Sequence, residues 1–164
     1  SSNKKIQRNE PVLVDLLHAH LGYIVDMTRM FVHGSLSKEW EERLEMTQEI
    51  EQIVVSSLDK GENCSEAWRK GLACSVEMGI NSHLMGQFPD QSRFLGHSVG
   101  LELDESPVVA EGFDSPLPIG GVMAIEPKLV YDDGAIGIED TWVRTKDGLE
   151  PISHRDDFPA LIEW

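Results

Sequence analysis

Two pairs of acidic residues in this sequence have a spacing that could bring carboxylates together. Asp15 and Asp26 are eleven residues apart. A hairpin that turns at His20-Leu21 would place them directly opposite each other on one face of a sheet. Opposed like charges destabilise a sheet, and buried carboxylates without partners either cost free energy or take up protons. The pair therefore predicts a nearby cation.

Glu126 and Glu139 form the second pair, thirteen residues apart. A turn at Asp132-Asp133 would oppose them directly. A turn at Asp133-Gly134, the stronger hairpin signal, would make them diagonal neighbours on the same face. Both alternatives bring the two carboxylates to one side of a sheet.

Metal ions explain these four carboxylates better than basic side chains do. The runs around Asp15, Glu126 and Glu139 contain only Lys128 and Arg144 as bases. Carboxylate oxygens favour hard divalent cations. The sequence therefore predicts a metal site made mainly of carboxylates.

One histidine could add a nitrogen ligand. His97 lies in the segment 96–100, where flanking glycines allow the backbone to approach a crowded site closely. Carboxylates with a single imidazole favour Mn, Fe, Co or Zn over a thiolate-type site. His18 and His20 form an alternative His-x-His metal pair, although their position in an expected turn is typical of exposed polar residues.

Composition bounds the class of protein. The 164 residues, 40% of them hydrophobic, fit one globular domain, and a net charge of -15 argues against nucleic acid or an anionic membrane as partner. The acidic excess also fits an ordinary solvated surface. The sequence contains no membrane-spanning run or signal peptide. Cys64 and Cys74 are too far apart on one expected helix to pair, and free thiols fit a reducing compartment. We therefore expect a soluble, cytoplasmic protein.

The elements that would position these residues follow in the order strands, helices, strands. Apolar patterning predicts an α+β domain, with a curved antiparallel sheet covered by helices. The expected strands are Val12–Leu17, Tyr23–Phe31, Phe94–Leu103, Val122–Tyr131 and Ile136–Thr145, and the expected helices are Ser37–Leu58, with Ser37 as N-cap, and Ser65–Met78.

Four segments resemble the motifs of the pita-bread metallopeptidases, the family of methionine aminopeptidase, aminopeptidase P, prolidase and creatinase. The segments are Val14-Asp15-Leu16 with Gly22 to Phe31, Gly96-His97-Ser98-Val99-Gly100-Leu101, Ile125-Glu126-Pro127, and Gly137-Ile138-Glu139-Asp140-Thr141. They occur in the family's order. The short interval between the glutamates and the Asp-x-Thr-Arg form resemble the Xaa-Pro peptidases, that is, prolidase (Xaa-Pro dipeptidase) and aminopeptidase P.

The resemblance implies a hydrolase with two divalent metal ions, for example manganese, cobalt, zinc or iron. It assigns Asp15 to one ion, His97 and Glu126 to the other, and Asp26 and Glu139 to both. Two ions roughly 3.5 to 4 Å apart can hold and activate a water for attack on a peptide bond. The resemblance also makes Glu126 the expected proton-transfer residue. Thr28 and Thr141 lie two residues from ligands and are expected to donate hydrogen bonds to them.

Two positions depart from the family pattern. Asp104 stands where the best-known members place a substrate-binding histidine, and an ionised carboxylate cannot donate a hydrogen bond to an oxyanion. Arg93 replaces a second histidine, and no Arg or Lys lies between His97 and Glu126 to hold a dipeptide carboxylate. A catalytically weakened binding or scaffold module, or a non-peptidase hydrolase of this fold, is therefore the alternative to an Xaa-Pro exopeptidase acting on peptides.

The resemblance also implies that residues 1–164 are the C-terminal part of one catalytic domain, because the family's domain extends well before its first aspartate. A sheet that lacks those upstream elements would expose an edge and apolar surface. We therefore expect the chain to form a homo-oligomer.

Overall fold

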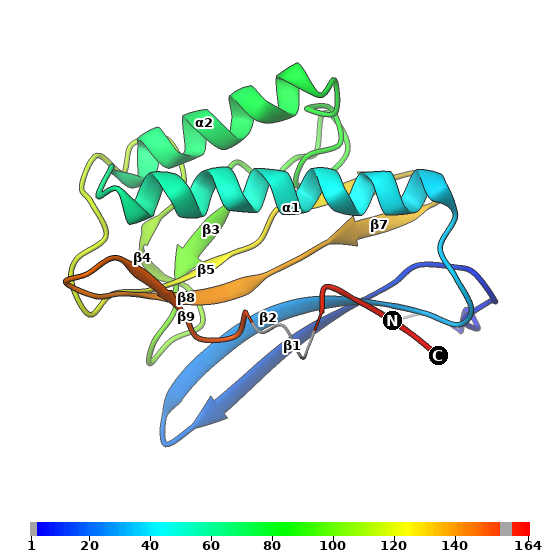
Figure 1. Ribbon diagram of the computed structural model, residues 1–164, viewed down its shortest axis with the longest axis horizontal. Coiled ribbons are helices and arrows are strands. Elements are labelled where there is room, and N and C mark those ends of the chain that lie inside the picture. Colours follow the sequence, from blue (N-terminus) through cyan, green and yellow to red (C-terminus); the bar gives the residue numbers. More distant parts are fainter. Residues whose placement is uncertain (1–2, 155–158) are drawn as a thin grey trace.

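The computed structural model describes residues 3–154 and 159–164. Its two helices lie together on one side of the molecule, and the long β1–β2 hairpin lies on the opposite side, with most of the remaining strands between them and the C-terminal strand beside β2 (Figure 1). The chain order of strands, helices, then strands confirms the predicted α+β class. The full set of elements is β1 Val12–His20, β2 Tyr23–Val32, α1 Lys38–Asp59, α2 Cys64–Glu77, β3 Gly96–Ser98, β4 Glu105–Val108, β5 Val122–Ile125, β6 Lys128–Tyr131, β7 Gly134–Gly137, β8 Asp140–Arg144, β9 Leu149–Pro151 and β10 Leu161–Glu163.

The long helix α1 forms where the apolar spacing predicts it. The Ser37 side chain caps its first turn by accepting a hydrogen bond from the Trp40 amide at 3.4 Å, which confirms the predicted N-cap. The predicted apolar stripe is buried at Leu44, Ile50 and Val54, so this face of the helix points into the core.

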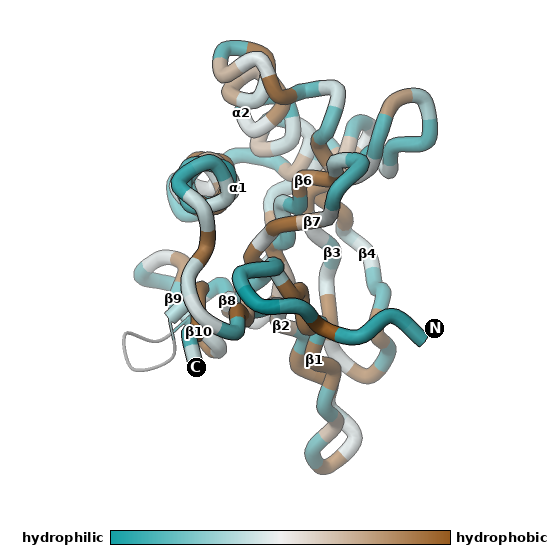
Figure 2. Tube along the Cα trace, turned by 90° about the vertical axis from the view of Figure 1, so that its right-hand side faces the viewer, coloured by the Kyte–Doolittle hydropathy of each residue, from teal (hydrophilic) through white to brown (hydrophobic). Residues whose placement is uncertain are grey.

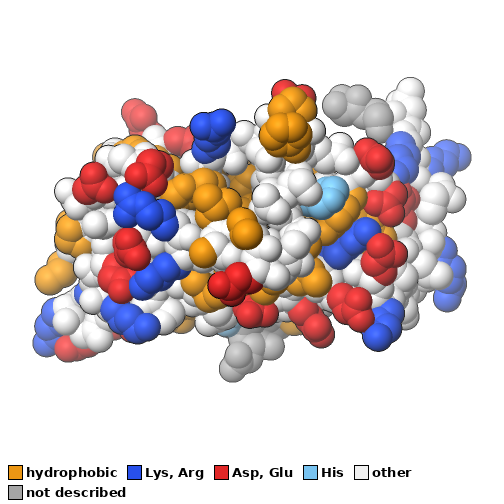
Figure 3. Space-filling view, turned by 90° about the horizontal axis from the view of Figure 1, so that it is seen from above, with side chains coloured by type: hydrophobic (Ala, Val, Ile, Leu, Met, Phe, Trp, Pro, Cys, Tyr) orange, Lys and Arg blue, Asp and Glu red, His pale blue; other side chains and the backbone are white. Residues whose placement is uncertain are grey.

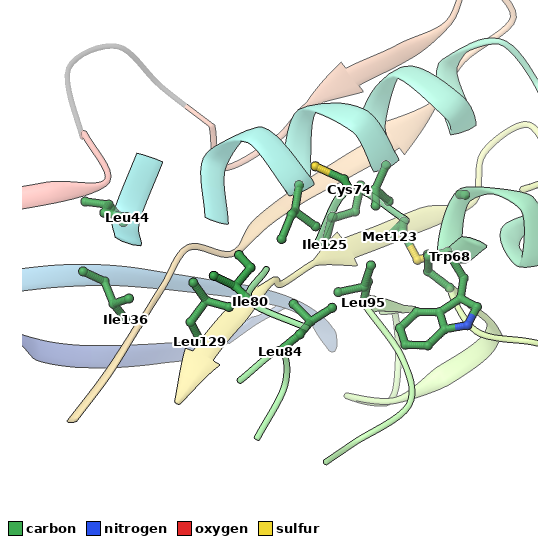
Figure 4. Close-up of a cluster of buried hydrophobic side chains, with 14 of the residues drawn as sticks. Leu44, Trp68, Cys74, Ile80, Leu84, Leu95, Met123, Ile125, Leu129 and Ile136 are labelled. Atoms are coloured by element: carbon green, nitrogen blue, oxygen red, sulfur yellow. The ribbon is translucent and has the colours of Figure 1, made fainter. Parts of the chain in front are cut away.

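The hydrophobic core fills the space between the helices and the strands beneath them (Figure 4). Ile125, Leu129 and Ile136, from β5, β6 and β7, are fully buried, and α1 packs against all three strands. Burying one such side chain contributes about 1.5–3 kcal/mol. This core fixes the strands that carry the two glutamates. Cys64 and Cys74 are buried and unpaired, as predicted.

The strands form three sheets rather than one continuous sheet. Their orders are β1-β2-β10, β4-β3-β5-β8-β9 and β6-β7. Pairing is antiparallel, as predicted, except that β10 runs parallel to β2. In Figure 2 the β1–β2 hairpin lies at the end of the molecule opposite the two helices and extends away from them.

The register of the first hairpin differs from the prediction. The turn lies at Leu21-Gly22, where φ is 51° and 88°. Two successive positive φ values are typical of a two-residue hairpin turn, and glycine adopts them at low cost. The slip of two residues pairs Asp15 with Thr28 rather than Asp26. Asp15 and Asp26 are thus diagonal neighbours, still on one face, because side chains alternate with a period of two.

The second hairpin has the register given by a turn at Asp132-Asp133. Ile125 pairs with Asp140, and Lys128 pairs with Gly137, so both ladders continue a single register. Three expected strands are shorter or interrupted: 94–103 forms only Gly96–Ser98, and a gap of two residues divides each of the runs 122–131 and 136–145. Strands β4, β9 and β10 were not predicted.

The helical face of the molecule carries acidic and basic side chains side by side, with scattered apolar ones between them (Figure 3). Within residues 3–154 and 159–164, no helix combines the length and the apolar character that a membrane span requires.

Candidate metal centre

The predicted ligands converge where the β1–β2 hairpin meets the five-stranded sheet, beside the bridge between Thr28 and Glu139. One ligand atom from each of Asp26, His97 and Glu139 lies within 4.8 Å of the other two, and all three residues are buried. Nε2 of His97 is 3.9 Å from Asp26 Oδ2 and 3.4 Å from Glu126 Oε1. Residues from four separate stretches of sequence therefore share one small region.

The two glutamates reach this region because the second hairpin is interrupted beside them. Proline at position 127 has no N–H to donate to a ladder. The Glu126 amide instead donates to the Leu95 carbonyl at 2.9 Å. Glu139 exchanges two backbone hydrogen bonds with Thr28 of β2, at 3.1 and 3.3 Å. The interruption thus ties the hairpin β1–β2 to the larger sheet at the metal centre.

A glycine allows β3 to carry His97 into the same region. A Cβ atom on Gly96 would lie 2.3 Å from the Ala124 carbonyl oxygen and 3.2 Å from the Ile125 Cα. Any side chain there would push β3 away from β5. The predicted close approach of the glycine-flanked segment is therefore observed at Gly96.

Two buried carboxylates in the centre lack partners for one oxygen each. Within the described part of the chain, Asp26 Oδ1 and Glu139 Oε1 are buried and accept no hydrogen bond. Burial, followed by the charge of Asp15, raises the pKa of Asp26 to about 6. Burial, followed by the charge of Glu126, raises the pKa of Glu139 to about 7. A divalent cation would satisfy both oxygens and favour both ionised forms.

His97 and Glu126 stabilise each other's charged form. Burial disfavours the imidazolium, but the neighbouring Glu126 outweighs it, and the pKa of His97 rises to about 9. Burial likewise opposes ionisation of Glu126, yet His97 and Lys128 shift its pKa downward. In a metal-bound centre the imidazole would be neutral, since a ring nitrogen binds a metal only after losing its proton.

Lys128 is the component that sequence reasoning underestimated. Its Nζ donates hydrogen bonds to Glu126 Oε2 at 2.6 Å and to Glu139 Oε2 at 3.0 Å, and it lies 3.8 Å from Asp15 Oδ2. The signal was present, because residues 126 and 128 are two apart and so point to the same face of an extended chain. In the sequence, Lys128 is one of only two bases in the runs around Asp15, Glu126 and Glu139, which favours metal ions over a salt bridge.

The two threonines occupy different positions. The Thr28 hydroxyl donates to Glu139 Oε2 at 2.8 Å and lies 3.2 Å from Asp15 Oδ1, so it contacts predicted ligands directly. The Thr141 hydroxyl donates to the backbone carbonyl of Asp26 at 2.6 Å. The sequence predicted a hydrogen bond from this threonine to a ligand side chain. The Thr141 hydroxyl instead bonds the main chain of β2 at Asp26.

The remaining candidates lie at the margin of the centre or outside it. The Asp104 side chain is 75% exposed, with Oδ1 at 3.5 Å from His97 Nδ1. Arg93 is exposed and lines a separate surface cavity beside Trp68 and Phe88. His18 and His20 are exposed at the end of strand β1 rather than in a turn, because the hairpin turn lies one residue further on than predicted.

Three comparisons place this geometry among known proteins. Metallopeptidase family M24 matches residues 1–146. An Xaa-Pro dipeptidase of Lactobacillus delbrueckii subsp. lactis is 32% identical over 155 residues, covering 93% of this chain and 40% of the relative. The crystal structure of a prolidase from Pyrococcus horikoshii OT3 superposes with a TM-score of 0.82 and 31% identity, over 95% of this chain and 44% of that one.

An X-Pro aminopeptidase structure from Thermotoga maritima MSB8 has a TM-score of 0.88 at 23% identity, over 100% of this chain and 44% of its own. This similarity shows the same fold. The chain spans about two fifths of the length of the curated relatives it matches, 40% in the case of the Lactobacillus dipeptidase.

Proposed function

Because the chain belongs to metallopeptidase family M24, we propose that its metal centre serves hydrolysis of Xaa-Pro or related N-terminal peptide bonds. The observation that carries this proposal is the pair of buried, unpartnered oxygens of Asp26 and Glu139 beside His97. Such groups cost free energy in a folded protein unless a ligand satisfies them. The similarity to Xaa-Pro dipeptidases supports the substrate class.

The carboxylates and the imidazole of the centre fit divalent metal ions. Asp26, His97, Glu126 and Glu139 would hold one ion, and Asp15 with Asp26 and Glu139 would hold a second, with Mn, Co, Zn or Fe as candidates. A bound ion of this kind polarises a peptide carbonyl and activates water. Lys128 Nζ already hydrogen-bonds Glu126 and Glu139 and lies 3.8 Å from Asp15 Oδ2, so a cation already occupies part of the centre.

Glu126 is the residue proposed to move protons. Its side chain is 9% exposed, so it is shielded from bulk water, and its Oε1 faces His97 while Oε2 accepts from Lys128. A positioned carboxylate of this kind can take a proton from the attacking water and pass it to the leaving amine. Asp104, at the exposed margin, would bias the orientation of His97 or contact the substrate.

The test is hydrolysis of Xaa-Pro dipeptides and of longer peptides with proline second, using the full-length gene product loaded with Mn²⁺. Asp26→Asn removes a buried ligand charge and should abolish both tight metal binding and turnover. Asp147→Asn changes an exposed carboxylate, 79% accessible, and should leave both unchanged. Wild-type activity in Asp26→Asn, or equal loss in Asp147→Asn, would contradict the proposal.

A binding or scaffold role is the second candidate. It is favoured by Asp104, which is exposed and cannot donate to an oxyanion, and by Lys128, whose ammonium already hydrogen-bonds Glu126. The same assay separates the two functions. Metal binding without turnover on either peptide series supports the scaffold.

The longer catalytic domain, the peptide partner, the cytoplasmic location and the homo-oligomer also remain our predictions for the whole protein. The coverage of 40% of a curated relative and 44% of a solved structure supports the view that residues 1–164 are part of a larger catalytic domain.

A further inference from the structure

Lys128 divides the metal centre into two unequal halves. Its Nζ is within 4 Å of three carboxylates, those of Asp15, Glu126 and Glu139. The other half contains the mutually close ligand atoms of Asp26, His97 and Glu139. The Lys128 ammonium is therefore already bonded to Glu126 Oε2 and Glu139 Oε2, whereas Asp26 Oδ1 and Glu139 Oε1 accept no hydrogen bond from the residues described.

The local backbone holds the lysine in this position. Lys128 pairs with Gly137 across the β6–β7 ladder, in the register that also aligns Glu126 with Glu139. A Cβ atom on Gly137 would lie 2.6 Å from Lys128 Cγ and 2.9 Å from the Pro127 carbonyl oxygen. The glycine thus leaves the space through which the lysine stem passes. The side chain is only 17% exposed, so its ammonium is directed into the centre rather than into solvent.

We propose that Lys128 is a built-in competitor for the second metal ion. This inference rests on the proposed function, because it describes how the same centre loads. Asp26, His97 and Glu139 would hold the first divalent ion, since Asp26 and Glu139 each have an oxygen that accepts no hydrogen bond among the residues described, while Glu126 stays bonded to Lys128. Asp15, with Asp26 and Glu139, would hold a second ion only after the ammonium withdraws from Glu126 and Glu139, which also frees Glu126 for the first ion.

Two costs oppose the second ion. The ammonium and a divalent ion repel each other at the distances of this cluster. Displacing the ammonium also breaks its hydrogen bonds with two charged carboxylates, which are the stronger kind of hydrogen bond. Together these costs should make the second ion bind at least about tenfold more weakly than the first.

Titration of the metal-depleted protein with Mn²⁺ tests this inference. Equilibrium dialysis with elemental analysis counts bound ions, and electron paramagnetic resonance distinguishes an isolated ion from a coupled pair. Lys128→Met keeps most of the apolar stem and removes the charge, while Lys128→Arg keeps a charge. Lys146→Met removes a lysine charge that is 82% exposed and serves as the matched control.

We expect the wild type, Lys128→Arg and Lys146→Met to bind one ion tightly and a second at least about tenfold more weakly, with a spectrum of isolated Mn²⁺ at one equivalent. Lys128→Met should bind its second ion at least about tenfold more tightly than the wild type and give a coupled spectrum at two equivalents. If Lys128→Met is unstable, Lys128→Gln makes the same comparison, and the two-step wild-type titration stands without either variant.

Uptake of two ions by the wild type in a single step, or a second-ion affinity unchanged in Lys128→Met and Lys128→Gln, would overturn the role of Lys128 and leave the proposed metallopeptidase function intact. Failure of hydrolysis alone shows in the peptide assay and leaves this titration unchanged, whereas failure of the proposed metal centre gives a different result here. In that case neither the wild type nor any Lys128 variant would bind Mn²⁺, and both proposals would fall.

Discussion

Nη2 of Arg29 lies 2.7 Å from Oδ1 of Asp140, and both side chains are almost completely buried, at 1% and 0% exposure. The guanidinium also donates to the backbone carbonyls of Thr28 and Glu139 at 3.0 Å and of Ser153 at 3.1 Å. Arg29 therefore joins β2 to β8 directly behind two residues of the metal centre. This buried pair makes the position of Glu139, a proposed ligand, depend on a residue outside the proposed ligand set.

Arg29→Met should lower the free energy of unfolding by about 3–5 kcal/mol, because it removes the buried guanidinium from Asp140 and leaves that buried charge to Ser153 and His154. Chemical denaturation monitored by circular dichroism measures the change. Arg69→Met is the matched control, since Arg69 pairs with Glu111 at 2.8 Å on the surface, at 48% and 66% exposure. The control should lose no more than about 1 kcal/mol. Equal effects of the two substitutions would contradict the role given to Arg29.

Glu51 gives the stability of the chain a pH dependence. Burial, reinforced by the charge of Asp140, raises the pKa of Glu51 to about 8 from an ordinary value of 4.5. The folded state therefore binds this proton more tightly than the unfolded state, so stability falls as pH rises from about 4.5 to about 8. Arg29 opposes part of this shift by favouring the ionised form.

Glu51→Gln removes the titration and should stabilise the chain relative to the wild type above pH 8, by up to about 5 kcal/mol. The two proteins should converge in stability below about pH 4.5, where Glu51 is protonated in both states. Denaturation midpoints measured across this range provide the test, with exposed Glu45→Gln on the same helix as control. A stability difference that does not vary with pH would show that Glu51 does not titrate as described.

The sequence predicted most of the architecture because its signals were local. Ser37 at the start of a helical pattern and the alternating runs around Asp26 and Glu139 are such signals. The register of the first hairpin was wrong because the choice between turns one residue apart depends on which residues accept positive φ, and Leu21 does so beside Gly22.

The remaining errors concern contacts between distant segments. Arg29 and Asp140 are 111 residues apart in sequence, and their pairing depends on how β2 crosses β8. Strand β10, near the C-terminus, pairs with β2. Its three residues are too short a run for apolar patterning to predict either the strand or its partner. Lys128 was visible in the sequence, but its role in the centre followed only from the position of its Nζ.

Metal should stabilise the folded chain, because binding would satisfy Asp26 Oδ1 and Glu139 Oε1 in the folded state alone. Removing metal with a chelator should therefore lower the melting temperature, and adding Mn²⁺ should restore it. Glu139→Gln should weaken this response, while exposed Glu150→Gln should keep it. An unchanged melting temperature, together with less than one bound metal per chain, is incompatible with the proposed centre.

Glu126→Gln should reduce hydrolysis more than it reduces metal content. The amide keeps the shape of the side chain and one oxygen for coordination, but it cannot carry a proton between water and the leaving group. A loss of turnover of about 10²-fold or more is expected, with metal content measured on the same full-length preparation. Turnover near the wild-type value would remove Glu126 from the mechanism, and a parallel loss of metal would reduce its role to coordination.

Strand β1 should mediate self-association. It is an edge strand of the sheet β1-β2-β10, and its Leu16 is 38% exposed on the face opposite Asp15. An edge strand offers unpaired N–H and C=O groups to another chain, and exposed apolar residues along it strengthen such pairing. Light scattering over a range of concentrations should therefore show dimers or larger species. Leu16→Lys places a charge on this edge and should shift the chain toward monomer, while Leu101→Lys, at a residue 66% exposed outside the strand, should not. A folded wild-type chain that stays monomeric at every concentration would show that the edge of β1 needs no partner.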